Sequence, residues 1–211
     1  MSTHAKVYLH PAIERIWHWI HAVCILGLIV TGVGIHWPTS LTVIGGLETS
    51  VAVHNLIGWV TIADLALWLA YNLILGRLHH YIPTRKDLWP GTFVQAKYYG
   101  MDCFMGAEHP YHPQPDNKFN PLQKLSYLGV MALIMPLLCL TGLLYLYPVE
   151  FGGVIAALGG LSTIAIVHFI LGGVCTAFLI AHVYLCTMGT TVTEDFTHMI
   201  TGFGDDHASH H

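Results

Sequence analysis

Four stretches of the chain are almost entirely apolar, and they lie at 17–36, 53–76, 124–147 and 162–188. A helix needs about 20 mostly apolar residues to cross the hydrocarbon core of a bilayer. Each stretch meets that length, and for the second and fourth we expect tilting or extension past the lipid. Pro136 lies inside the third stretch and predicts a kink, because proline removes a helical hydrogen bond. The pattern predicts an all-α membrane protein, a bundle of four transmembrane helices.

The longest polar segment is the loop 77–123, which holds six of the ten prolines. Within it, 91–105 has the composition of a helix that lies on the membrane surface. At the end of the chain, 204–211 is polar and is expected to be a flexible tail. The sequence shows no internal repeat, and we expect residues 1–211 to form a single membrane domain.

Charged residues are scarce, and their positions orient the chain. They make up 9% of the sequence, against about 25% in a typical soluble domain. All eight lysines and arginines lie before the first span, in the loop 77–123 or at Lys124. Because positively charged loops stay on the cytoplasmic side, this loop and both termini are expected to be cytoplasmic. The formal net charge of −4 gives no indication of nucleic-acid binding.

Histidine is the residue type that stands out. The chain has 16 histidines, and several lie in or beside apolar stretches, where an ionisable side chain is costly and usually functional. The five cysteines are dispersed, and none forms a CxxC or CxxCH sequence. This spacing gives no support for covalent haem attachment, thioredoxin-like chemistry, a cysteine zinc site or a disulfide framework.

Four of the histidines fall at two matched depths of the predicted bundle. His168 and His182 are 14 residues apart, close to four helical turns, so both lie on one face of the fourth helix about 21 Å apart. With the orientation above, His54 lies at the outer level with His168, and His18 lies at the inner level with His182. Two imidazoles at one depth can fill the two axial positions of a haem iron. The pattern predicts two stacked haems with these four histidines as axial ligands.

A small residue follows each of these histidines at position i+4, on the same face of its helix. These residues are Ala22, Gly58, Gly172 and Cys186. A flat macrocycle can approach a helix closely only where the side chains are small. His21 has Ile25 at that position, which makes it the poorer ligand.

The four histidines have two alternative uses besides axial ligation. A proton relay fits the two depths but does not account for the small residues at i+4. Direct binding of zinc or copper is a poor match, because zinc needs about four ligands converging on one ion, and two levels about 21 Å apart do not converge.

Five further ionisable residues have roles that the sequence leaves open. Asp64, within the second span, is either a proton carrier or a hydrogen-bonding partner inside the bundle. His21 and His36 lie in the first span, and His36 suits an interfacial position. His79 and His80 lie with basic residues at the inner surface, where they either contact haem propionates or a quinone, or belong to a segment that anchors the helices.

Several segments together resemble the cytochrome b, or gamma, subunit of respiratory formate dehydrogenase. They are ERIWHWIHAVCILGLIVTG (14–32), VAVHNLIGW (51–59), HHYIPTRKDL (79–88), NKFNPLQK (117–124), and the IVHFILGG and LIAHVYL segments around His168 and His182. The opening ERIWHW and the late TVTEDFTHMITGF (191–203) are also similar to the cytochrome b subunit of membrane-bound nickel–iron hydrogenase. The resemblance covers nearly the whole chain.

The resemblance implies a specific electron-transfer role in the bacterial inner (cytoplasmic) membrane. The four histidines would bind two haems b, paired as the depths predict. An iron–sulfur subunit, next to a catalytic subunit on the outer side, would deliver electrons, and menaquinone or ubiquinone would accept them at the inner side. The quinone pocket would be bordered by Asn120, with Gln123 close by and His182 as the haem ligand beside it.

Two other function classes remain open from the sequence. One is a stand-alone cytochrome b that exchanges electrons between quinone and a diffusible acceptor such as superoxide. The other is a haem-free membrane transporter. The sequence contains no site of its own for oxidising formate or hydrogen.

Overall fold

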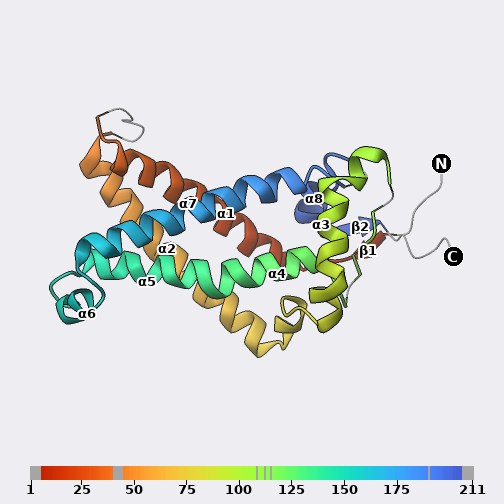
Figure 1. Cartoon of the computed structure of the whole chain (residues 1–211), viewed down its shortest axis with the longest axis horizontal. Helices are drawn as coiled ribbons and strands as arrows, with labels where there is room; N and C mark the ends of the chain where they lie inside the picture. Colours follow the sequence, from red (N-terminus) through yellow and green to blue (C-terminus); the bar gives the residue numbers. More distant parts are fainter. Residues whose placement is uncertain are drawn as a thin grey trace. The chain divides into compact units, whose positions relative to one another are not determined.

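The computed structural model describes residues 6–39, 45–107, 109–111, 113–114, 116–189 and 191–205. Among these residues, four helical segments are long and apolar enough to cross a membrane: α1 (Ala12–His36), α2 (Leu47–Ile74), the segment Pro121–Leu146, and α7 (Leu161–Leu185) (Figure 1). The four predicted spans are confirmed. The first two begin earlier than expected, because the helices continue through polar residues beyond the apolar stretches.

The third span is interrupted where the sequence predicts a kink. It consists of α4 (Pro121–Gly129), a π-helical turn η4 (Val130–Ile134) and α5 (Met135–Leu146). Pro136 lacks an N–H, and its ring would collide with the carbonyl four residues earlier. The wider π-helical turn just before Pro136 is one of the ways in which a helix accommodates such a break.

The chain divides into two compact units, and all four spans contribute to both. Unit 1 comprises Met1–Ile16, Asn72–Val130 and Leu179–His211, and unit 2 comprises Trp17–Tyr71 and Met131–Phe178. Unit 2 therefore holds most of the length of α1, α2, α5 and α7. Side-chain contacts described below join α1 to α2, α2 to α7 and α5 to α7, so these segments form a helical bundle.

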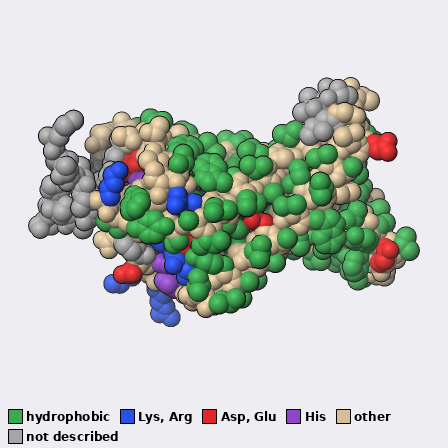
Figure 2. All heavy atoms as spheres, turned by 180° about the vertical axis from the view of Figure 1, so that it is seen from behind, with side chains coloured by type: hydrophobic (Ala, Val, Ile, Leu, Met, Phe, Trp, Pro, Cys, Tyr) green, Lys and Arg blue, Asp and Glu red, His purple; other side chains and the backbone are tan. Residues whose placement is uncertain are grey.

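The surface of the helices is apolar and their interior contains few buried apolar side chains. A small cluster in unit 2 buries Leu144, Ile155 and Ile164, of which Ile155 belongs to the short helix α6 (Gly152–Ala157). Many large apolar residues are exposed instead, including Leu56 and Leu67, and green hydrophobic side chains cover much of the face in Figure 2. Exposed apolar side chains of this kind suit contact with lipid. The helices also satisfy the backbone N–H and C=O groups internally, as a segment that crosses the hydrocarbon core must. The four spans and this surface indicate a multi-pass membrane protein.

Apart from α6, the short elements outside the bilayer-length helices belong to unit 1. Strand β1 (Lys6–Tyr8) pairs antiparallel with β2 (Phe203–Asp205), with Lys6 opposite Asp205 and Tyr8 opposite Phe203. Gly204 and Asp205, assigned to the flexible tail by the sequence, are therefore strand residues, and 206–211 lie outside the described residues. The other elements are η1 (Arg77–His80), η2 (Asp87–Gly91), α3 (Thr92–Gly100), η3 (Asp102–Met105) and α8 (Glu194–Thr201). The helix expected over 91–105 corresponds to α3 and η3.

A buried ion pair fixes the loop 77–123 to the third span. Lys124 Nζ lies 3.0 Å from Asp87 Oδ2, and the two side chains are 6% and 12% exposed. The same oxygen accepts the backbone N–H and the hydroxyl of Thr84, both at 2.8 Å. Burial raises the pKa of Asp87, but the hydrogen bonds from Thr84 and Lys124 outweigh it and hold the pKa below its ordinary value.

Asp87→Asn is expected to lower the free energy of unfolding by about 3 kcal/mol, because it leaves the Lys124 ammonium buried without its counter-charge. Thermal unfolding of the purified protein in detergent measures the change. The lowered pKa predicts stabilisation by ionised Asp87 at neutral pH that is lost as pH falls below the ordinary aspartate pKa of about 3.9. Asp102→Asn is the matched control, since its partner Lys97 is 56% exposed, and should cost about 1 kcal/mol at most. Equal losses in the two variants would contradict this account.

Candidate functional site

Two of the predicted ligands, His54 on α2 and His168 on α7, lie together in unit 2. Their ring centroids are 6.4 Å apart and the ring planes meet at 71°. A metal ion that sits about 2 Å from each of two imidazole nitrogens on opposite sides holds the ring centres about 6 Å apart. The observed spacing therefore suits two axial ligands of one metal.

The Nδ1 atom of each ring is held by a threonine hydroxyl from a different helix. Thr31 Oγ1 lies 2.8 Å from His54 Nδ1 and 2.7 Å from the carbonyl of Gly27. A hydroxyl has one hydrogen. If Thr31 donates that hydrogen to the carbonyl, it must accept one from Nδ1–H of His54. The other ring nitrogen, Nε2, then keeps its lone pair, as a metal ligand requires.

The same arrangement occurs around His168. Thr141 Oγ1 lies 2.8 Å from His168 Nδ1 and 2.7 Å from the carbonyl of Leu137. The two anchors share a Thr-Gly sequence, 31–32 and 141–142. A Cβ added to Gly32 or Gly142 would lie 3.5 Å from Cε1 of the adjacent imidazole, so a longer side chain would crowd the ring. The sequence analysis did not predict that these threonines contact the histidines, although the two Thr-Gly pairs could have indicated it.

Open space adjoins the helices that carry the two ligands. An ideal Cβ built on Gly58 or Gly172, the i+4 residues of His54 and His168, meets no atom within 4 Å. A flat prosthetic group can lie against a helix at such positions. The imidazole spacing, the protonation state set by the threonines and this space all fit a haem.

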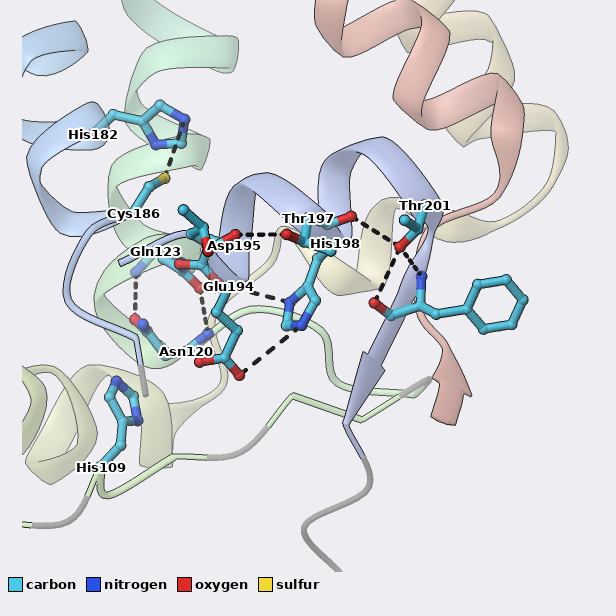
Figure 3. Close-up of polar contacts among 12 residues, drawn as sticks. His109, Asn120, Gln123, His182, Cys186, Glu194, Asp195, Thr197, His198 and Thr201 are labelled. Carbon is cyan, nitrogen blue, oxygen red and sulfur yellow. Dashed lines mark hydrogen bonds and ion pairs between the residues drawn. The ribbon is translucent and has the colours of Figure 1, made fainter. Parts of the chain in front are cut away.

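The other two predicted ligands fall in different units. His182, near the end of α7, belongs to unit 1, and His18 belongs to unit 2. His182 Nδ1 lies 3.5 Å from the hydroxyl of Tyr127. Its Nε2 lies 4.0 Å from Cys186 Sγ (Figure 3). The His18 ring packs edge-on against Trp19, with centroids 5.2 Å apart. The pairing of His18 with His182 stays a prediction.

Asn120 and Gln123, the predicted quinone-pocket residues, form the N-terminal cap of α4. Asn120 Oδ1 accepts the Gln123 N–H at 2.8 Å, and Gln123 Oε1 accepts the Asn120 N–H at 3.0 Å (Figure 3). Asn120 Nδ2 also donates to the Tyr99 hydroxyl at 3.2 Å. This reciprocal capping explains the Asn-Pro-x-Gln sequence structurally. The Gln123 Nε2 amide has no hydrogen-bond partner within the described ranges.

Acidic and thiol groups of unit 1 lie in the same region as His182. Helix α8 carries Glu194, Asp195 and His198, and the His198 ring lies 3.7 Å from Asp195 Oδ1 (Figure 3). Burial raises the pKa of Asp195. Burial, and then the charge of Asp195, raise the pKa of the Cys186 thiol to about 12. Burial, and then that charge, also raise the pKa of Tyr99 to about 12.

The structure gives His21 and Asp64 a common role. His21 Nδ1 lies 2.8 Å from Asp64 Oδ2, and the two side chains are 15% and 6% exposed. Trp17 stacks on the His21 ring, with centroids 5.1 Å apart, and its Nε1 donates to the backbone carbonyl of Asp64 at 3.2 Å. Asp64 is thus the hydrogen-bonding partner that the sequence left open. His36 stacks on Phe169, with centroids 4.4 Å apart.

Comparisons with known proteins identify the family of the chain. Residues 9–202 match the family model described as prokaryotic cytochrome b561. The chain is also 35% identical over 201 residues to the protein of Escherichia coli (strain K12) named "Putative cytochrome YdhU". The aligned region covers 94% of this chain and 74% of that protein. The chain therefore belongs to the prokaryotic cytochrome b561 family, whose members bind haem b and transfer electrons in the membrane.

Proposed function

We propose that the chain holds two b haems, one between His54 and His168 and one between His18 and His182, and that it passes electrons from an iron–sulfur partner to a membrane quinone. The observation that carries the proposal is the pair His54 and His168, with rings 6.4 Å apart and each Nδ1 2.8 Å from a threonine hydroxyl. Haem b supplies a one-electron couple, because its iron cycles between ferric and ferrous states.

The second haem level is supported by helix geometry. His168 and His182 lie on the same helix, α7, 14 residues apart, which corresponds to about 21 Å along the axis. Two haems at these two levels would span most of a hydrocarbon core of about 30 Å. They would connect the two faces of the membrane within one chain.

The outer side is proposed to receive electrons from a partner subunit. The loop 148–161 has no lysine or arginine, which supports an outer location. Around α6 it exposes apolar side chains, including Val149, Val154 and Leu158, beside Glu150. An apolar surface of this kind suits a protein neighbour. The resemblance to formate dehydrogenase and hydrogenase subunits favours an iron–sulfur subunit joined to a catalytic subunit.

The inner side is proposed to reduce menaquinone or ubiquinone. Reduction of a quinone to a quinol takes up two electrons and two protons. Near His182, the Gln123 amide can donate a hydrogen bond to a quinone carbonyl, and Asn120 holds Gln123 in place through the cap. Asp195, whose pKa burial raises, accepts a proton more readily than a solvated aspartate. Protons taken from the cytoplasm while electrons arrive from outside would contribute to a proton gradient.

His182→Ala is expected to abolish quinone reduction while leaving a haem that remains reducible, because His54 and His168 are untouched. His168→Ala should remove that other haem. Haem extraction and reduced-minus-oxidised spectra of the purified variants count the haems, and a quinone-reduction assay measures turnover. His36→Ala is the control and should keep both haems. Normal turnover in His182→Ala would show that the ligand assignment is wrong.

Thr141→Val is expected to weaken haem retention about tenfold or more, because it leaves the Nδ1–H of a ligating His168 without an acceptor. The midpoint potential of that haem should change as well. Haem loss to apomyoglobin and a redox titration measure the two effects. Thr176→Val is the matched control, since the Thr176 hydroxyl also donates to an i−4 carbonyl at 2.8 Å. The anchor has no role in haem binding if both variants behave alike.

A further inference from the structure

A partly buried group of charged residues in unit 1 has more positive than negative charge. Glu14, in the first turn of α1, lies 2.7 Å from Arg77 Nη2 through Oε1 and 2.8 Å from Lys118 Nζ through Oε2. The Lys118 side chain is 4% exposed. His10 Nδ1 lies 3.9 Å from the same Oε2. Two cations thus share a single carboxylate, both of whose oxygens are occupied.

His80 adds an unsatisfied polar atom to this group. The residue is 7% exposed in η1, and its Nδ1 is buried without a hydrogen-bond partner among the described residues. Burial, and then the charges of His79, Lys118 and Arg77, lower the pKa of His80 to about 4, although the charge of Glu14 raises it. His80 is therefore neutral at pH 7, and its proton can sit on Nδ1 as a donor.

Arg77 carries a second unsatisfied atom. Its Nε is buried and also lacks a partner within the described part of the chain, although its Nη2 contacts Glu14. A buried donor left unpaired is energetically unfavourable. An oxyanion could accept a hydrogen bond from each of these two nitrogens. It would also neutralise the excess positive charge beside them.

We propose that Arg77, His80 and Lys118 form a binding site for an oxyanion, a carboxylate or a phosphate, carried by a molecule embedded in the membrane. The basic residues flank the second and third spans, η1 following α2 and Lys118 preceding α4. Positively charged residues at this level of a membrane protein meet lipid headgroups. One source of the oxyanion is therefore the phosphate of an anionic phospholipid.

The other source is a propionate of the haem assigned to His182, and this arm rests on the proposed function. A row of ring contacts joins the site to that ligand within unit 1. Tyr81, next to His80, packs on Phe119, next to Lys118, with centroids 5.2 Å apart. Phe119 packs on Tyr127 at 5.1 Å, and Tyr127 on His182 at 5.9 Å. These ring contacts form a continuous row from the neighbours of His80 and Lys118 to His182.

The first test measures lipid binding to the purified full-length protein. Native mass spectrometry after exchange into equal amounts of phosphatidylglycerol and phosphatidylcholine counts the retained lipids. For a phospholipid site, wild type retains phosphatidylglycerol about tenfold more tightly than Arg77→Gln, the scale of a lost charge-assisted hydrogen bond. Arg85→Gln, which removes an exposed cation from the same loop, should behave as wild type.

Glu14→Gln distinguishes loss of the binding site from a general loss of stability. It removes the carboxylate that competes for Arg77 and Lys118, so anion binding should strengthen. If the substitutions acted only by destabilising the protein, Glu14→Gln would weaken anion binding and would not strengthen it.

The second test compares haem in the same variants. For a propionate site, lipid retention is unchanged, whereas Arg77→Gln loses haem faster than Arg85→Gln and the midpoint potential of one haem falls, because a positive charge that favours the reduced form has gone. If Arg77→Gln and Arg85→Gln match in lipid retention, haem loss and potential, the site binds no oxyanion and the proposal is overturned. A protein without a haem at His182 would contradict the proposed function separately, while the lipid test would still decide the site.

Discussion

The hydrogen bond between a threonine hydroxyl and an imidazole Nδ1 is the interaction on which the proposed haem site depends. Water is absent from the hydrocarbon core, so each buried imidazole must find a partner in the protein. Thr31 and Thr141 supply that partner 2.8 Å from His54 and His168. When each hydroxyl also donates to its own helix, it directs the imidazole proton to Nδ1 and leaves the Nε2 lone pair for the iron of the proposed haem. The same hydrogen bonds join neighbouring helices.

The same constraint governs the other polar side chains of the spans. Asp64 lies within α2, where an isolated carboxylate would be costly, and it is paired with His21 at 2.8 Å. Asp87 and Lys124 form a second buried pair. The group of Glu14, Arg77, Lys118 and His80 differs, since its charges and hydrogen bonds do not balance among the described residues. That imbalance distinguishes the proposed oxyanion site from the two structural ion pairs.

Periodicity and charge were sufficient to predict the four spans and the distortion near Pro136, because both follow from local composition. The proximity of His54 and His168 was also predictable, from the orientation of the spans that carry them. The Thr-Gly anchors and the partner of Asp64 were not, since they depend on which helices are neighbours. Asn120 shows a different limit, because its sequence motif fits both a helix cap and a ligand contact, and the structure demonstrates the cap. Membership of the cytochrome b561 family favours electron transfer over the haem-free transporter.

The central claim is that this one chain carries two haems at two levels. A reduced-minus-oxidised optical spectrum, combined with haem extraction and protein quantification on the purified wild-type chain, tests it most directly. The account predicts two non-covalent b haems per chain. One haem per chain would contradict the two-level assignment and leave one histidine pair without its role. A colourless protein that cannot be reconstituted with haem would contradict the electron-transfer function itself.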